Sequence, residues 1–458
     1  MFDIKIMNGQ VLDLDQNSFR EADIGIRDGK IVELGALKES AVHIIDAKGF
    51  IVSPGFIDIH MHEEDYSLTE NPEYDISEAM LNMGVTTAVV GNCGNNRQDI
   101  CDVEAFIDVK GNPVNYMSYI GHNFLRQKVG NTNTLQESTP EQIEQMAELV
   151  QNAVDEGAIG VSFGLEYCKG ITFAEATGIC SRIVGRKDLL LSAHYRDDAD
   201  KALAAIEEMA EIGRTLGIPF QISHLSSCSA FGNMSQALDL ITELRKDGLD
   251  IMADAYPYPA FSTFIGSDVF APGCFERWGK TFEAIELTES PYENVRCTKE
   301  IFEDARANYP DMLAICYAMN EEEIVEALKH PLVMVASDGI YRNHKGHPRG
   351  AGTFPKFIGK YLRDQKIIDF FEGMKKITCM PADRLHLADR KGYLRAGYDA
   401  DIVVFDYDSI IDKATFGNAQ ARPEGIEWVI LNGRIALSEG RVVDKTCGRF
   451  LRRPRQRR

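Results

Sequence analysis

The stretch Gly55-Phe56-Ile57-Asp58-Ile59-His60-Met61-His62 is a short apolar run that ends on two histidines. Seven further short apolar runs follow it, most of them at intervals of about 30 residues, the length of one strand and one helix. They cover residues 86–92, 116–122, 158–164, 189–194, 220–225, 250–256 and 332–338. Eight such units close a barrel, so the sequence predicts the α/β class and a (β/α)8 barrel of the TIM type. An open flavodoxin-like sheet is the rival fold, but it does not need eight units.

The intervals between the runs carry helix-like sequence. In 141–155 the apolar residues recur at the spacing that places them on one helix face: Ile143, Met146, Leu149, Val150 and Val154. The interval before 332–338 is far longer than the others and contains another apolar run at 313–319. We interpret residues from about 264 to 330 as an insertion over the barrel mouth.

Within this insertion, residues 266–299 contain four large aromatic side chains, Phe270, Phe275, Trp278 and Phe282. Such side chains fit a lid that excludes water from an active site. They fit the ordinary packing of an excursion equally well.

Both ends of the chain are rich in short β segments. The turn dipeptides Asp28-Gly29 and Asn432-Gly433 each stand next to short apolar runs, as in β-hairpins. We therefore predict one small β-sandwich domain built from residues 1–54 and 395–450, around a barrel of residues 55–394. The Arg-rich residues 451–458 are expected to form a solvated basic tail rather than a nucleic-acid or targeting segment.

The composition limits the classes of function. The chain has 458 residues with 49 Lys plus Arg and 70 Asp plus Glu, a net charge of −21, which disfavours nucleic acid as a partner. There is neither a signal-like N-terminus nor an apolar run long enough to span a membrane. Ten cysteines without a CxxC pair indicate a reducing compartment, so we expect a cytoplasmic protein.

Residues of the types that commonly bind metals stand at the ends of the predicted strands. His60 and His62 are two positions apart on a strand and therefore point to the same side. Cys93 follows the second run, and the fifth, sixth and eighth runs end at or near His194, His224 and Asp338. The carboxyl ends of barrel strands meet at one mouth, and imidazole, thiolate and carboxylate together suit Zn²⁺. His122 carries no second signal, and we interpret it as structural.

With these motifs in order, the chain resembles the amidohydrolase superfamily and, more narrowly, the N-acyl-D-amino-acid deacylases, or D-aminoacylases. The opening signature is residues 55–62. Further stretches match the family along nearly the whole chain: Gly84-Val85-Thr86-Thr87, Gly91-Asn92-Cys93-Gly94, Gly164-Leu165-Glu166-Tyr167, His194-Tyr195-Arg196-Asp197, Ile222-Ser223-His224, Asp254-Ala255-Tyr256-Pro257-Tyr258, Ser337-Asp338-Gly339, His347-Pro348-Arg349 and Ala400-Asp401-Ile402-Val403.

The resemblance implies roles for the matching residues. Cys93, His194 and His224 would hold a tightly bound zinc ion, and His60 and His62 would serve a second, weaker metal position. Asp338 would be the catalytic base.

The resemblance also implies how the substrate is held. Arg349, Tyr256 and Ser262 would hold the substrate carboxylate. Ser226 departs from the family, which has a lysine there for the same carboxylate, so the standard substrate is open to question.

The expected function is hydrolysis of amide C–N bonds, with N-acyl-D-amino acids as the substrates that the resemblance implies. The alternatives are a cyclic amidase of the dihydroorotase or hydantoinase type and a non-catalytic barrel assembly protein. We expect a small-molecule amide as partner, with neither nucleic acid nor membrane, and leave open whether the chain forms a homo-oligomer.

Overall fold

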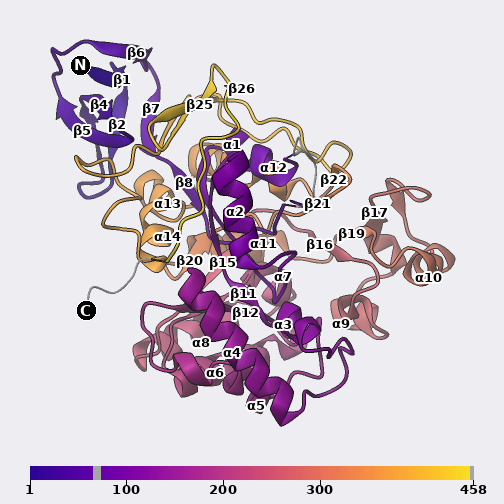
Figure 1. Ribbon diagram of the computed structural model, residues 1–458. Helices are drawn as coiled ribbons and strands as arrows, with labels where there is room; N and C mark the ends of the chain where they lie inside the picture. Colours follow the sequence, from indigo (N-terminus) through magenta and orange to yellow (C-terminus); the bar gives the residue numbers. More distant parts are fainter. Residues whose placement is uncertain (65, 67–73, 454–458) are drawn as a thin grey trace.

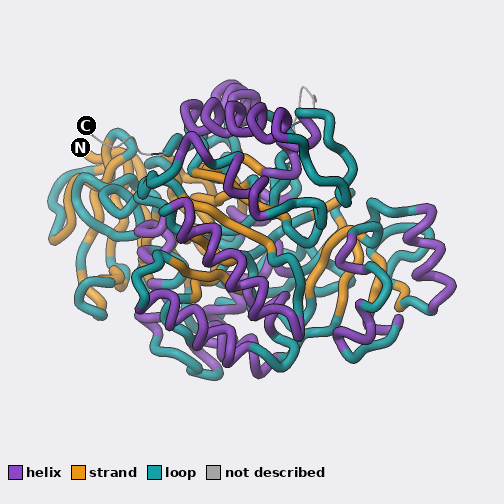
Figure 2. The backbone as a smooth tube through the Cα atoms, turned by 90° about the horizontal axis from the view of Figure 1, so that it is seen from below, coloured by secondary structure: helices purple, strands orange, loops and turns teal. Residues whose placement is uncertain are grey.

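The computed structural model describes residues 1–64, 66 and 74–453. A body of parallel strands and surrounding helices forms the centre of the molecule (Figures 1 and 2). Strands from both chain ends form a smaller region on one side of the body, and an excursion of the chain projects from the other side. The protein is therefore of the α/β class.

The eight predicted strand positions are confirmed. Each apolar run contains a parallel strand, and the third contains two that are separated by Tyr119 alone. The strands are β8 (Phe56–Asp58), β9 (Val85–Val90), β10 (Asn115–Ser118), β11 (Ile120–Gly121), β12 (Gly160–Gly164), β13 (Leu190–His194), β14 (Phe220–Ile222), β15 (Ile251–Ala255) and β20 (Val333–Val335).

These strands form two parallel sheets with the orders β10-β9-β8 and β11-β12-β13-β14-β15-β20. The segments that follow the first and last strands also pair, because Met61 forms a parallel bridge with Gly339. In addition, the amide of Asp338 donates to the carbonyl of His60 at 2.8 Å. The ends of β8 and β20 therefore lie side by side, although His60 and Asp338 are 278 residues apart in the sequence.

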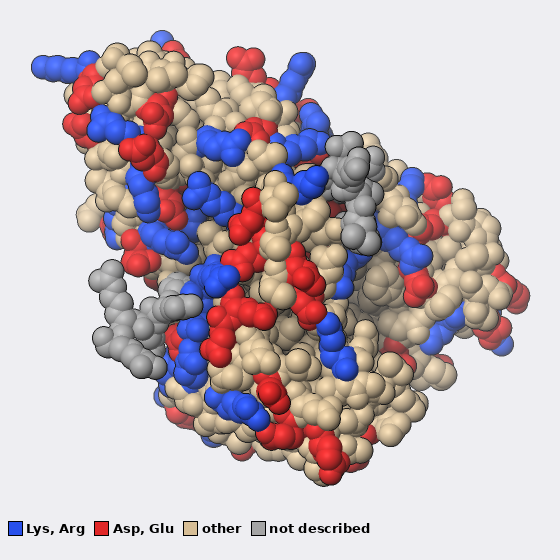
Figure 3. Space-filling model, in the orientation of Figure 1, with Lys and Arg blue, Asp and Glu red and all other residues tan. Residues whose placement is uncertain are grey.

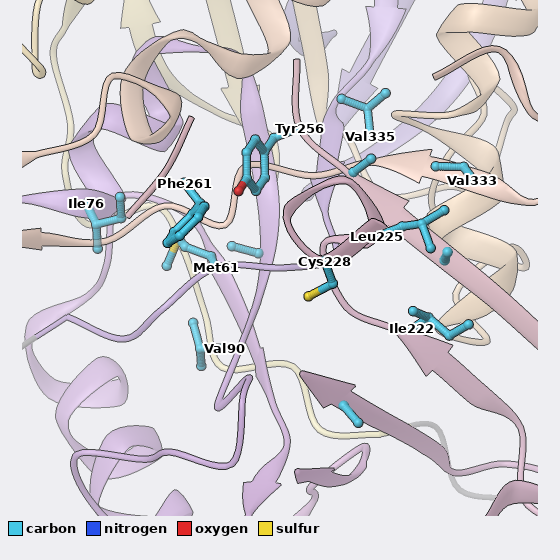
Figure 4. Close-up of a cluster of buried hydrophobic side chains, with 14 of the residues drawn as sticks. Met61, Ile76, Val90, Ile222, Leu225, Cys228, Tyr256, Phe261, Val333 and Val335 are labelled. Carbon is cyan, nitrogen blue, oxygen red and sulfur yellow. The ribbon is translucent and has the colours of Figure 1, made fainter. Parts of the chain in front are cut away.

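Both faces of these strands are covered. All residues of β9 and β12 are buried, which explains why the runs are almost continuously apolar instead of alternating. Gly160 begins β12 at a φ of 152°, and a Cβ there would lie 1.8 Å from the carbonyl oxygen of Leu190. Only glycine permits this approach. Figure 4 shows part of the core, in which Met61, Val90, Ile222 and Leu225 belong to one buried cluster.

Helices follow most of the strands. In helix α4 (Pro140–Glu156) the sequence sets both ends. Thr139 caps the N-terminus in a capping box, and Gly157 ends the helix in the left-handed region. The other helices of the body are α1 (Ile76–Asn82), α2 (Ile100–Lys110), α3 (His122–Lys128), α5 (Phe173–Gly178), α6 (Ala202–Leu216), α7 (Leu225–Ser229), α8 (Met234–Lys246), α11 (Glu321–Lys329), α12 (Arg349–Lys356), α13 (Phe370–Lys375) and α14 (Cys379–Arg384), with 3-10 turns η1 (Ser181–Ile183) and η2 (Ala199–Lys201) and the π-helix η5 (Phe357–Asp364).

Strands from both chain ends share one sheet. Its order is β26-β25-β24-β23-β7-β2-β3, and β23 runs antiparallel to β7. The strands are β2 (Gln10–Asp13), β3 (Ser18–Glu21), β7 (Ile51–Pro54), β23 (Ile402–Phe405), β24 (Ile426–Leu431), β25 (Arg434–Ser438) and β26 (Arg441–Val442).

A second sheet, β5-β4-β1-β6, packs against it through a common buried cluster that includes Ile4, Val52 and Ile402. Its strands are β1 (Phe2–Met7), β4 (Asp23–Arg27), β5 (Lys30–Gly35) and β6 (Ala41–Asp46). The predicted turns Asp28-Gly29 and Asn432-Gly433 are both present with positive φ angles, as two-residue hairpins require.

The excursion between β15 and β20 is an antiparallel sheet of order β16-β19-β17-β18 with two helices. It comprises β16 (Phe261–Phe264), η3 (Asp268–Phe270), α9 (Cys274–Trp278), η4 (Phe282–Ala284), β17 (Ile285–Leu287), β18 (Val295–Arg296), α10 (Lys299–Asn308) and β19 (Leu313–Cys316). Its antiparallel strands thus begin before the predicted residue 264 and end well before 330, since α11 packs on α8 of the body. A short hairpin, β21 (Tyr341–Arg342) and β22 (Lys345–Gly346), follows β20.

The last described residues lie against the body. Tyr116 donates its amide to the carbonyl of Arg449 at 2.9 Å and accepts from the amide of Leu451 at 2.6 Å. Arg452 pairs with Glu104, and Arg453 contacts Asp188. The start of the predicted solvated tail is therefore anchored, and residues 454–458 lie outside the described residues.

Acidic and basic side chains are interspersed over the face shown in Figure 3, which is hollowed where the excursion meets the body. Within the described part of the chain, every helix is too short or too polar to cross a bilayer.

Candidate metal centre and active site

The predicted donor residues meet at one end of the parallel strands. His194 is the last residue of β13, His60 and His224 follow β8 and β14 by two residues, and Cys93 and Asp338 follow β9 and β20 by three. Parallel strands end at the same edge, so this placement brings the side chains together.

The distances define a compact cluster. The Sγ of Cys93 lies 3.4 Å from Nε2 of His224 and 3.5 Å from Nε2 of His60. Asp338 Oδ1 lies 3.1 Å from Nε2 of His62 and 3.4 Å from Nε2 of His60. Three overlapping groups offer donor atoms within 4.8 Å of one another: His60, His62 and Cys93; Cys93, His194 and His224; and His60, His224 and Asp338.

Three of these residues have a left-handed backbone conformation, which residues other than glycine usually avoid. The φ angle is 54° at Cys93, 34° at His224 and 50° at Asp338. Such left-handed residues cost about 1–3 kcal/mol each and gather at functional sites. The surrounding fold therefore holds these three donors in place against a local preference.

Two carboxylates that the sequence reasoning did not assign support the cluster. Asp254 Oδ1 lies 3.2 Å from Nδ1 of His60 and accepts the amide of His224 at 2.8 Å. Glu166 Oε2 lies 2.9 Å from Nε2 of His194. Both residues stand at or just beyond a strand end, in stretches that matched the family. This position is the feature of the sequence that could have identified them as neighbours of the cluster.

The charges of the cluster depend on one another. Burial acts to raise the pKa of the Cys93 thiol, but the neighbouring His60 and His224 outweigh it and lower that pKa well below its usual value. Burial likewise acts to raise the pKa of Asp338, while Arg349, His224 and His60 hold it well below the usual range. The site thus stabilises a thiolate and a carboxylate among imidazoles.

This donor set fits a divalent metal. A thiolate and neutral imidazoles are ligands that zinc and similar ions prefer. Nδ1 of His194 is buried and has no hydrogen-bond partner among the residues that the structure describes. A buried nitrogen left in this way beside Cys93 and His224 is what a ligand position requires.

The cluster opens into a cavity of about 1330 Å³ between the body and the excursion. His62, His194, His224 and Asp338 lie in its wall, together with Glu166, Tyr167, Ser227 and Arg349. The excursion contributes Phe261 to Phe264, Gly266, Ser267 and Val269. The ring of Tyr167 lies 4.4 Å from that of His194.

The three residues predicted to hold a carboxylate are neighbours. Arg349 is 1% exposed, with Nη1 3.0 Å from Asp338 Oδ2 and Nη2 donating to the carbonyl of Ser262 at 3.1 Å. Its guanidinium lies 4.6 Å from the ring centroid of Tyr256. Arg349 and Ser262 line the cavity, whereas Tyr256 is fully buried and does not line it.

The aromatic side chains of the excursion pack on one another. The ring centroid of Phe275 lies 4.4 Å from that of Phe282 and 6.2 Å from that of Trp278. The ring centroids of Phe270 and Trp278 are 6.0 Å apart. Of the described residues that line the cavity, none is one of these four aromatics. Ordinary packing therefore accounts for them, and the cavity wall is formed by the residues that precede them.

Two other residues named in the sequence analysis do not line the cavity. His122 is fully buried with Nε2 2.8 Å from Glu175 Oε1, which Arg126 also contacts at 2.5 Å. Ser226, which stands in place of the family lysine, is fully buried, and its hydroxyl lacks a hydrogen-bond partner within the described ranges.

Comparisons with known proteins agree with this geometry. The model of the amidohydrolase family matches residues 43–272 and 292–437. A D-aminoacylase of Alcaligenes xylosoxydans xylosoxydans is 32% identical, over 99% of this chain and 98% of the relative. The crystal structure of an N-acyl-D-glutamate deacylase from Bordetella bronchiseptica, complexed with zinc and a phosphonate inhibitor, superposes with a TM-score of 0.88 at 29% identity, covering 98% of this chain and 99% of that one.

A D-hydantoinase structure, at 18% identity and a TM-score of 0.62 over all of both chains, shares the fold. The family resemblance read from the sequence is confirmed. The chain belongs to the amidohydrolase family and, within it, to the group of the D-aminoacylases.

Proposed function

We propose that this protein is a zinc-dependent hydrolase of amide C–N bonds that deacylates N-acyl-D-amino acids. The observation that carries the proposal is the cluster of Cys93, His194 and His224, with Asp338 beside it, in the wall of a large cavity. Relatives named as a D-aminoacylase and N-acyl-D-glutamate and N-acyl-D-aspartate deacylases support it.

Two metal positions are available to the donors. Cys93, His194 and His224 would hold the first ion, and His60 and His62, which share Cys93 with them, would serve a second. A bound Zn²⁺ lowers the pKa of a water towards 7 and polarises a carbonyl, which supplies the nucleophile and the electrophile for amide hydrolysis.

Asp338 moves the proton in this proposal. It is a buried carboxylate whose Oδ1 lies 3.1 Å from Nε2 of His62 and 3.4 Å from Nε2 of His60, so it stands beside the metal donors where it would accept a proton from the attacking water. It then returns that proton to the leaving nitrogen, which would otherwise depart as an unstable anion.

Arg349 and Ser262 would hold the carboxylate of the substrate from the cavity wall. The planar guanidinium matches a carboxylate, and the hydroxyl of Ser262 is buried with no partner of its own among the residues described. Tyr256 would act from behind by supporting the guanidinium with its ring.

We also infer that the eight parallel strand positions close as a (β/α)8 barrel. The bridge between Met61 and Gly339 supports closure, because it joins the first strand position to the last. The two sheets at the chain ends would form a small β-sandwich domain of residues 1–54 and 395–450, beside a barrel of residues 55–394.

One observation favours a second candidate. Ser226 removes the lysine that assists carboxylate binding in the family, so a cyclic amide without a free carboxylate is the competing substrate class. A non-catalytic assembly protein is disfavoured, since such a protein has no need of the full donor set.

The test is a screen of N-acyl-D-amino acids, N-acyl-L-amino acids and cyclic amides, with metal analysis on the same sample. We expect turnover of the D compounds by protein that carries at least one equivalent of zinc. Turnover of cyclic amides alone would establish the second candidate, and metal-free protein would overturn the proposal.

A further inference from the structure

The contact between Glu166 and His194 joins the ends of two neighbouring strands. Gly164, the last residue of β12, pairs with His194 on β13, and Glu166 follows two residues later. Both side chains are buried, with side-chain exposures of 4% for Glu166 and 8% for His194. Their 2.9 Å contact is therefore shielded from water and strong.

The contact decides which nitrogen of His194 is free. An ionised carboxylate only accepts hydrogen bonds, so Nε2 of His194 must carry the proton and donate to Glu166. The neutral ring then presents its lone pair at Nδ1, the nitrogen that has no hydrogen-bond partner in the described structure. A metal-binding histidine needs this arrangement, because its second nitrogen fixes the tautomer and the ring orientation.

The excursion holds Glu166 from the other side. Nη2 of Arg277, on α9, lies 3.5 Å from Glu166 Oε1, while Oε2 faces His194. Arg277 is itself held, because its Nε contacts Asp198 and its Nη2 donates to the carbonyl of Val269 at 3.3 Å. The two oxygens of Glu166 thus have two partners in different directions, which fixes the plane of the carboxylate.

We propose that Glu166 is a positioning residue of the metal centre, and that Arg277 extends this support to the excursion. Glu166 sets the tautomer and orientation of His194, and Arg277 sets the orientation of Glu166. This inference rests on the proposed metal-dependent function.

The chain contains a matched control for the first step. Glu175 and His122 form the same kind of buried pair, with Nε2 to Oε1 at 2.8 Å, but away from the cluster. Glu166→Gln and Glu175→Gln therefore remove the same charge from the same kind of contact. Only the first removal touches a histidine of the metal cluster.

The experiment measures Zn²⁺ binding to chelator-stripped protein by competition with a chromophoric chelator, without substrate. We expect Glu166→Gln to weaken Zn²⁺ binding by about 10- to 100-fold, since a carboxylate behind a ligating histidine has an effect of this size. Glu175→Gln should leave the affinity unchanged. An unchanged affinity in Glu166→Gln, or an equal loss in both variants, overturns the inference.

A second readout separates positioning from general stability. With Co²⁺ in place of zinc, the visible absorption bands report the geometry of the ligands, and we expect them to shift in Glu166→Gln but not in Glu175→Gln. Identical spectra in all three proteins would contradict a positioning role. Wild-type protein that binds neither ion would refute the proposed function itself.

The role of Arg277 is tested in two backgrounds. Arg277→Gln should weaken Zn²⁺ binding on the order of threefold in the wild type and have no further effect in Glu166→Gln, because it acts through that carboxylate. Arg306→Gln is the control, since Arg306 also supports the excursion by donating to the carbonyls of Ile265 and Ser267. Equal effects of Arg277→Gln in both backgrounds would show that it does not act through Glu166.

Discussion

At the scale of single residues, three donors of the cluster have unfavourable backbone conformations. Cys93, His224 and Asp338 all adopt positive φ angles, although glycine would adopt them at lower cost. Their side chains therefore contribute something that glycine cannot, and we propose that this is the capacity to bind a metal and transfer a proton.

The first prediction concerns the thiolate. Cys93→Ala should lose most of the zinc in purified protein, because Sγ is common to two of the three donor groups. Elemental analysis measures this directly. Cys101→Ala, at an exposed cysteine, is the control and should keep its metal. Full metal content in Cys93→Ala would remove the thiolate from the site.

Asp338→Asn tests the proton transfer. The amide cannot accept the proton, so kcat should fall by about 10²- to 10⁴-fold while the zinc content is kept. Asp311→Asn changes a carboxylate that lines the same cavity but is 81% exposed, and its kcat should stay near that of the wild type. An active Asp338→Asn enzyme would mean that another group is the base.

Arg349→Lys tests the carboxylate contact. Lysine keeps the charge but loses the planar fork, so KM for carboxylate-bearing amides should rise by about tenfold or more, while neutral amides are affected less. Arg342→Lys, at the half-exposed rim, is the matched control. An equal loss on both substrate types would show that Arg349 does not read the carboxylate.

The gathering of the proposed metal donors and the proposed base was predictable from the sequence, because these residues follow apolar runs whose strand character is evident. Glu166 and Asp254 were not assigned, because a carboxylate near a strand end has no diagnostic spacing. Their roles depend on which atom of a neighbouring histidine they face, and this is a property of three-dimensional packing.

At the scale of elements, the parallel strands and the presence of an insertion before the last strand were predictable, whereas the strand pairing inside the insertion was not. Its strand β16 pairs with β19, which comes after two helices and two further strands, and nothing local in the sequence specifies that pairing. The sequence left two interpretations of its aromatic residues open, a lid and ordinary packing, and the structure favours packing. Their contacts show that they form the core of the excursion.

Helices α3 and α5 are joined by buried contacts of Glu175 with His122 and Arg126, and these contacts lead to a prediction about the pH dependence of stability. Burial acts to raise the pKa of Glu175, but His122 and Arg126 outweigh it and lower the pKa to about 2. A carboxylate with a depressed folded-state pKa stabilises the fold above its unfolded pKa, and the stabilisation is lost as the pH falls through the folded value.

Glu175→Gln should therefore lower the free energy of unfolding by about 3–5 kcal/mol at pH 6, because Arg126 stays buried without its anionic partner. The difference from the wild type should shrink as the pH falls from about 4.3 towards 2. Urea unfolding at pH 6 and pH 3 measures both values. Glu144→Gln, in an exposed pair with Arg182, should change little at either pH.

At the scale of the whole molecule, distant parts of the chain complete each other. The terminal strands share one sheet, and the cavity needs walls from both the body and the excursion. The net charge of −21 adds a functional constraint, because an anionic substrate must approach an acidic protein. A buried cation such as Arg349 is then the local attraction that an anionic substrate requires.

The segment after residue 448 offers a test of this mutual dependence. Phe450→Ala should lower the free energy of unfolding by about 3–5 kcal/mol, since Phe450 is buried against the body beside Tyr116. Val443→Ala, at an exposed position nearby, should have little effect. Thermal or urea unfolding of the two variants decides the point, and equal stabilities would mean that the segment only rests on the surface.

The pairing of Tyr116 with this late segment also bears on how the protein is made. The amide and carbonyl of Tyr116 are satisfied by Arg449 and Leu451, and the amide of Arg453 bonds to the carbonyl of Gly157 just before β12. During translation, β10 and β12 leave the ribosome long before these partners exist. Until residues 449–453 have been synthesised, the backbone groups of Tyr116 and the carbonyl of Gly157 lack these partners, so this edge of the sheet is completed last.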